Sequence, residues 1–176
     1  MATTADKKPK RYDIAIVGGG ASGTILLLHL LETIRHPFSV ALIQKGHAIA
    51  KGVAYSTTDP SHLLNVRAGR MSAYAAAPTH FCEWLQRQPE YPAVLGPDKE
   101  SEAFVPRYLY GKYLQESLQN ALNRKKEDFT IDFIPAFATS VGQQEGYILN
   151  TDDGRKIAAD RICIATGIEA PHTLLS

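Results

Sequence analysis

A chain of 176 residues, 44% apolar and 21% charged, is long enough for one domain with a buried core. Its formal net charge of +1 argues against a nucleic-acid-binding surface, which carries a strong basic excess. The longest apolar stretch, residues 25–31, is far too short to cross a bilayer, and the polar N-terminus shows no signal peptide. Cys82 and Cys163 form no paired motif, so we expect a reduced, cytoplasmic chain. From the charge and the short apolar stretch we expect no nucleic-acid or membrane partner.

The first part of the chain predicts a strand–helix–strand unit. After a flexible polar tail over residues 1–11, the apolar run Tyr12–Val17 is typical of a strand buried on both faces. Glycines follow at once, and a helix is expected over residues 21–34, where Pro37 prevents its continuation. Residues 39–44 form a second buried strand. Such a unit requires a parallel strand pair with a right-handed crossover.

The middle of the chain predicts a long loop followed by two helices. Residues 45–78 show no clean period, and loops of this length are usually functional or disordered. In the first helix, Phe81, Trp84 and Leu85 share one face. The second helix begins near Pro106. It places apolar side chains at steps of four, at Tyr110, Leu114, Leu118 and Leu122.

From residue 129 onward the pattern changes to short strands. The expected runs are 129–134, 136–143, 147–151 and 161–165. Asp153-Gly154, between two of these runs, is a strong hairpin signal, and we expect the runs to form an antiparallel β-meander. The predicted fold class is therefore α/β: a three-layer Rossmann-type domain over residues 12–176, with a parallel sheet plus an antiparallel β-meander.

The sharpest motif is the glycine turn between the first strand and the first helix. Gly18, Gly20 and Gly23 match G-x-G-x-x-G in a strand–turn–helix context. The first glycine makes the tight turn, the second lets the backbone approach a pyrophosphate, and the third lets helix and strand pack closely. The phosphates would lie at the helix N-terminus, where free N–H groups favour negative charge. The alternative is a purely structural glycine turn. The expected dinucleotide contacts are Gly18, Gly19, Gly20, Ala21, Ser22 and Gly23.

The second strand ends where dinucleotide-binding domains usually carry an acid that binds the adenosine ribose. Here that position holds Gln44, followed by Lys45. An amide can accept one hydroxyl hydrogen bond, though more weakly than a carboxylate. We expect Gln44 and Lys45 to face the ribose. The alternative is that Lys45 binds a 2′-phosphate, which would make the chain an NADP-binding Rossmann protein.

Several blocks together carry a family resemblance. An apolar strand ending in Ala165-Thr166-Gly167 resembles the second flavin-contacting signature of the glutathione-reductase-like flavoproteins. With residues 52–56 (GVAYS), 62–72 (HLLNVRAGRMS) and 104–111 (FVPRYLYG), the chain is similar to bacterial FAD/NAD(P)-binding proteins, distant relatives of the lysine and ornithine N-monooxygenases. The resemblance implies FAD at the glycine turn, NAD(P)H as a co-substrate bound by an inserted domain, and hydride transfer to flavin, often followed by oxygen activation.

The resemblance also implies where the cofactor is contacted. The loop over residues 52–72 would cover the flavin side, and the Ala-Thr-Gly segment would close under the cofactor. Positive charge in that loop would stabilise an anionic reduced flavin; the alternative is that its polar residues only fix the loop by backbone hydrogen bonds. No residue is assigned as catalytic, because the cofactor carries the chemistry. None of the six histidines has metal-binding spacing, so no metal site is expected. The implied contacts are Tyr55, Asn65, Arg67, Met71, Ala165, Thr166 and Gly167.

Two departures from the family pattern qualify this assignment. Gln44 replaces the usual acid, and the chain ends nine residues after Gly167, before a nicotinamide-binding segment and a closing strand. The expected domain is thus incomplete, with its remainder on a longer chain or a second chain. The predicted function is the FAD-binding part of an NAD(P)H-dependent, monooxygenase-like flavoprotein oxidoreductase of unknown substrate. The alternatives are a non-catalytic dinucleotide-binding module and the NADP-binding protein.

Overall fold

The computed structural model describes residues 9–89 and 101–167, so the first eight residues of the expected tail lie outside it. A six-stranded sheet in the order β3-β2-β1-β6-β5-β4 organises the chain. Its strands are β1 (Arg11–Val17), β2 (Phe38–Ile43), β3 (Phe129–Ile134), β4 (Ala138–Gln144), β5 (Gly146–Thr151) and β6 (Lys156–Ile164). The helices are α1 (Ala21–Thr33), α2 (Gly52–Tyr55), α3 (His80–Gln86) and α5 (Arg107–Asn123), with a 3₁₀ turn, η1 (Ala68–Arg70).

The parallel part of the sheet contains β3, β2, β1 and β6. β1 pairs in parallel with β2, which confirms the predicted strand–helix–strand unit. β3 also pairs in parallel with β2, with Phe38 opposite Phe129 and Ile43 opposite Ile134. The prediction that this strand belongs to the antiparallel meander is therefore wrong. The reason is its connection, because the helices between β2 and β3 provide a crossover long enough to return the chain in the same direction.

The meander consists of β4, β5 and β6, and β6 belongs to both parts of the sheet. Residues 156–159 of β6 pair antiparallel with β5, and residues 158–164 pair in parallel with β1. β6 therefore begins at Lys156, five residues before the predicted strand. The predicted Asp-Gly hairpin lies between β5 and β6, with Gly154 in a left-handed conformation (φ +82°).

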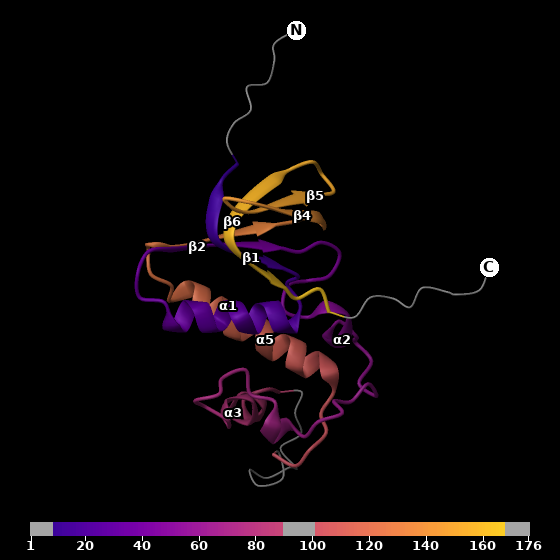
Figure 1. The fold of residues 1–176 in the computed structure, drawn as a ribbon. Coiled ribbons are helices and arrows are strands. Elements are labelled where there is room, and N and C mark those ends of the chain that lie inside the picture. Colours follow the sequence, from indigo (N-terminus) through magenta and orange to yellow (C-terminus); the bar gives the residue numbers. More distant parts are fainter. Residues whose placement is uncertain (1–8, 90–100, 168–176) are drawn as a thin grey trace, which may run out of the picture.

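The sheet separates two apolar cores, giving the three layers predicted. Helices α1 and α5 lie against each other and cover one face of the parallel strands, while the meander lies over the other (Figure 1). On the meander side, the fully buried Leu149 of β5 packs in one cluster with Ala41 of β2 and Ile134 of β3. No helix of the described residues is long and apolar enough to span a membrane.

Both predicted helices of the middle segment are present, and they meet through aromatic rings. Phe81, Trp84 and Leu85 of α3 are buried on one face, as predicted. The Phe81 ring lies 5.2 Å from that of Tyr110 and 4.9 Å from that of Tyr113, both on α5. Tyr113 is fully buried, and its hydroxyl accepts a hydrogen bond from the Ala73 N–H at 3.1 Å. The long middle segment is thus anchored on α5.

We expect His80 to make this contact sensitive to pH. Its Nδ1 lies 2.9 Å from the Tyr113 hydroxyl, and burial lowers the pKa of His80 below the ordinary 6.5. The unfolded chain therefore binds this proton more tightly than the folded chain does. We expect the contribution of His80 to the free energy of unfolding to be complete above about pH 6.5 and to fall as pH decreases below it. Urea unfolding at about pH 7.5 and about pH 5.5 measures the loss.

The control for this prediction is His80→Gln, which has no titrating ring. The pKa values of some carboxylates, such as Asp59 and Asp132, are lowered in the folded chain from the ordinary 3.8. Their contribution to stability changes only at pH values near and below 3.8, outside the range between these two measurements. The variant should lose less stability than the wild type between the two pH values. An equal loss in both proteins would assign the pH dependence to another group.

Candidate cofactor-binding site

The glycine turn joins β1, α1 and the end of β6. Gly18 has φ +104°, and its N–H donates to the Ile43 carbonyl at 2.8 Å. A Cβ on Gly18 would lie 2.2 Å from the carbonyl oxygen of Ala165. The Ala165 N–H in turn donates to the Val17 carbonyl at 2.7 Å. The conformation and the space both require glycine. The turn therefore brings the Ala-Thr-Gly segment directly against the first glycine of the motif.

Gly23 and Gly20 have opposite environments. A Cβ on Gly23 would lie 1.9 Å from the carbonyl oxygen of Gly18, so the third glycine is required for packing of α1 on β1. A Cβ on Gly20 would meet only the Cα of Gly52, at the ordinary contact distance of 3.7 Å. Gly20 therefore borders an open space, which a side chain at this position would partly fill.

That space is a cavity of about 410 Å³ at the N-terminus of α1. None of the described residues that line it is acidic, whereas Lys51 and Arg107 are cationic. The first turn of α1 carries no acid, and its N-cap Gly20 provides no side-chain hydrogen bond, so the first helical N–H groups remain for a ligand. These features fit a pyrophosphate. The cavity is lined by Gly20, Ala21, Ser22, Gln44, His47, Lys51, Gly52, Val53, Ala54, Tyr55, Arg107, Ala165, Thr166 and Gly167.

Comparison with known proteins agrees with this geometry. Residues 15–169 match the FAD-NAD(P)-binding family, which covers most of the chain. The chain belongs to this family. Among curated proteins, none matches by sequence.

Solved structures similar to this FAD-NAD(P)-binding chain include several monooxygenases. A steroid monooxygenase bound to NADP is 19% identical (TM-score 0.59), and the match covers 93% of this chain and 28% of that one. A closed structure of cyclohexanone monooxygenase is 16% identical (TM-score 0.64; 94% and 28%). A flavin monooxygenase from Stenotrophomonas maltophilia is 20% identical (TM-score 0.59; 92% and 41%). At these identities the likeness establishes the fold, and this chain spans less than half the length of each.

Most of the predicted contacts of the family lie at this cavity. Gly18, Gly19 and Gly23 build the turn beneath it rather than its wall. Burial raises the pKa of Tyr55, whose ring lies 4.9 Å from that of Tyr110, so its hydroxyl stays protonated at neutral pH. The predicted residues in the wall are Gly20, Ala21, Ser22, Gln44, Tyr55, Ala165, Thr166 and Gly167.

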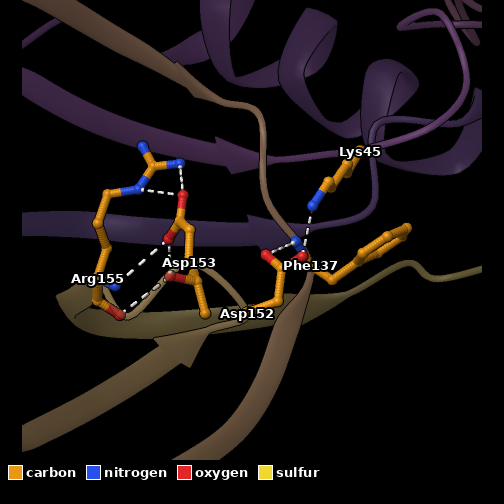
Figure 2. Close-up of polar contacts among 6 residues, drawn as sticks. Lys45, Phe137, Asp152, Asp153 and Arg155 are labelled. Carbon is orange, nitrogen blue, oxygen red and sulfur yellow. Dashed lines mark hydrogen bonds and ion pairs between the residues drawn. The ribbon is translucent and has the colours of Figure 1, made fainter.

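Lys45 lies apart from this wall. Figure 2 shows its Nζ directed at Asp152, 2.6 Å away, in the turn between β5 and β6. Its Nζ also lies 5.4 Å from the centre of the Phe137 ring, and the Phe137 N–H donates to the other Asp152 oxygen at 2.9 Å. Lys45 thus fastens the end of β2 to the meander. This arrangement does not support the alternative in which Lys45 binds a 2′-phosphate.

The predicted flavin-side residues Asn65, Arg67 and Met71 also lie elsewhere. Asn65 and Arg67, with Val66, Arg70 and Phe104, line a separate open hollow of about 420 Å³, while Met71 packs against the core. Arg67 forms an ion pair with Glu102. The structure therefore does not bring these three residues to the glycine turn. In residues 9–89 and 101–167, no cluster of His, Cys, Asp or Glu can hold a metal.

Sequence reasoning missed His47, Lys51 and Arg107 at the cavity. Arg107 stands at the start of α5, where its Nε donates to the Leu63 carbonyl at 2.9 Å. It belongs to the block 104–111 that carried the resemblance, and Lys51 directly precedes the block 52–56. Their positive charge beside these blocks was the available signal, because an anionic cofactor requires cations near its phosphates.

Proposed function

We propose that this chain is the FAD-binding part of an NAD(P)H-dependent flavoprotein oxidoreductase of the monooxygenase-like kind. The observation that carries the proposal is the cavity at the glycine turn, which combines an open face at Gly20, a free helix N-terminus and no acidic residue among those lining it. Anion binding at a helix N-terminus needs this combination of donors and positive potential. Family membership makes the anion the pyrophosphate of a dinucleotide.

Each segment around the cavity has a distinct task in this proposal. The backbone at Gly20 and the first turn of α1 bind the pyrophosphate, and Lys51 and Arg107 neutralise its charge. Gln44 lines the cavity beside the glycine turn, and the Ala165–Gly167 segment closes under the cofactor. When bound, FAD supplies the redox chemistry, and the protein positions it.

The remaining parts of the enzyme lie outside these segments. The chain covers 28% of the steroid and cyclohexanone monooxygenases that it resembles. We therefore propose that a further segment or a second chain contributes the NAD(P)H site and the substrate contacts. The hollow containing Asn65 and Arg67 would then face the flavin or the substrate in the complete enzyme. A cytoplasmic location, where NAD(P)H is available, completes the proposal.

The direct test is the visible absorption spectrum of the purified chain before and after FAD is added and the excess removed. A retained flavin band supports the proposal, and NAD(P)H oxidation is then assayed with the full-length protein. A retained band without any NAD(P)H oxidation would favour a non-catalytic module. A colourless chain that also ignores added FAD would overturn the assignment of this segment as a flavin site.

Two lysines test whether FAD binds at this cavity, because Lys51 lines it and Lys45 does not. Lys51→Met is expected to weaken FAD binding about tenfold, because it removes a cation from the cavity wall. The matched control is Lys45→Met, since Lys45 is held by Asp152 outside the wall. Its affinity for FAD should stay within about twofold of wild type. Fluorescence titration with FAD measures both, and a larger loss in Lys45→Met would return Lys45 to the binding site.

A further inference from the structure

The residue between the first two glycines of the motif is held from both sides. The Gly19 N–H donates to the side-chain oxygen of Gln44 at 2.7 Å. The Gly19 carbonyl accepts the Ala50 N–H at 2.8 Å and the Thr24 hydroxyl at 3.3 Å. Both polar groups of this one residue therefore have partners from other segments, and the orientation of its two peptide planes is fixed.

Gln44 is committed to this contact by packing as well as by hydrogen bonding. A Cβ on Gly19 would lie 3.1 Å from the Cβ of Gln44 and 2.8 Å from a methyl carbon of Leu42. The Gln44 side chain thus lies flat against Gly19. Its amide nitrogen makes only long contacts, 3.3 Å to the Lys45 carbonyl and 3.4 Å to the His47 carbonyl. The side-chain oxygen of Gln44 is the atom that would accept a hydrogen bond from a ribose hydroxyl. In this structure that oxygen is directed at the glycine turn.

The other side of the clamp uses an uncommon backbone conformation. Ala50 is fully buried and has φ +76°, a left-handed conformation that is unfavourable for a residue with a Cβ. Such a conformation persists where the surrounding structure determines it. Its N–H holds the Gly19 carbonyl. Because a trans peptide places C=O and N–H on opposite sides, the N–H of Gly20 is directed away from Ala50.

We propose that Gln44 is a positioning residue for the pyrophosphate. Its side-chain oxygen holds the peptide between Gly18 and Gly19, and the Ala50 N–H holds the next peptide, between Gly19 and Gly20. With both neighbouring peptide planes held, the Gly20 N–H is presented to the anion. Gln44 therefore contributes to affinity through the phosphate end of the ligand and not through the ribose hydroxyls. This inference rests on the proposed dinucleotide site, and it assigns Gln44 a role different from that of the acid usually found at this position.

The test compares two probes, ADP and 2′,3′-dideoxy-ADP, which share the pyrophosphate and differ in the ribose hydroxyls. Calorimetric titration of the full chain gives Kd for each. Gln44→Met should weaken both about tenfold and by the same factor, because the lost hydrogen bond lies in the turn. Gln44→Glu, which keeps an acceptor for the Gly19 N–H, should stay within about threefold of wild type for both probes.

A loss confined to ADP would show that Gln44 binds the ribose and would overturn the inference, as would unchanged affinity for both probes. Amide hydrogen exchange without ligand is an independent readout. The Gly19 amide should exchange faster in Gln44→Met and remain protected in Gln44→Glu. Equal protection in all three proteins would also overturn the inference. A wild-type chain with normal Gly19 protection that binds neither probe would instead overturn the proposed function. Gln44→Asn, one methylene shorter, replaces Gln44→Met should the latter fail to fold.

Discussion

Gly23→Ala is expected to lower the free energy of unfolding by about 3 kcal/mol or more. The added Cβ would lie 1.9 Å from the carbonyl oxygen of Gly18 and 3.2 Å from the Cγ2 of Ile16. A backbone oxygen cannot rotate away as a flexible side chain can, so α1 must move off β1. That movement would open the contacts of Leu27 and Leu28, both of which are fully buried. Urea unfolding followed by circular dichroism measures the loss.

The matched control is Gly142→Ala in β4. A Cβ at this position has nothing within 4 Å, and the residue has no positive φ. The control should therefore change stability by no more than about 0.5 kcal/mol. Should Gly23→Ala be tolerated as well as Gly142→Ala, the close packing of α1 on the turn would be contradicted.

Gly20→Val is expected to reduce FAD affinity at least about 100-fold while leaving the fold intact. Gly20 adopts φ −70° and ψ −164°, an extended conformation open to any residue. Its Cβ would be in ordinary contact with Gly52, and its methyl groups would occupy the cavity. Replacing the N-cap glycine costs about 1 kcal/mol of stability at most. Within one motif, Gly23→Ala should therefore lower stability, whereas Gly20→Val should lower FAD affinity.

The flavin band retained after gel filtration measures this second effect, and the unfolding curve of the same sample measures stability. The expected result is a folded, colourless Gly20→Val chain. A Gly20→Val chain that holds FAD as tightly as wild type would place the cofactor away from the glycine turn. An unfolded chain would show that the space at Gly20 is smaller than the distances indicate.

The elements that the sequence predicted well are those with local signals. The apolar run of β1, the glycines after it and Pro37 after α1 each act over a few residues, and the observed bounds differ by little. The direction of β3 carries no such signal. Its residues, Phe-Thr-Ile-Asp-Phe-Ile, suit either strand direction, and only the crossover through α5 decides it. The early start of β6 likewise depends on pairing with β5.

The residues of the candidate site also fall into those with a local sequence signal and those placed by distant segments of the chain. The glycine turn was predicted because its three glycines follow one another within a few residues of sequence, directly between a strand and a helix. The contribution of Lys51 and Arg107 depends on α2 and the start of α5 lying beside that turn, which spacing along the chain does not reveal. Lys45 is adjacent to Gln44 in sequence but lies outside the cavity wall, because its Nζ binds Asp152. That partner is 107 residues away in sequence, so the sequence alone does not reveal the contact.

The position of β6 in two sheet regions has a consequence for how the molecule opens. Its first residues hydrogen-bond to β5, its later residues to β1, and it leads directly into the Ala165 contact with the glycine turn. The meander cannot detach without disturbing the strand that ends at the cofactor cavity. Lys45 and Asp152 join the same two regions a second time. We therefore expect the described part of the chain to unfold as one cooperative unit, so that a loss of stability in the meander also lowers the fraction of chains able to bind the cofactor.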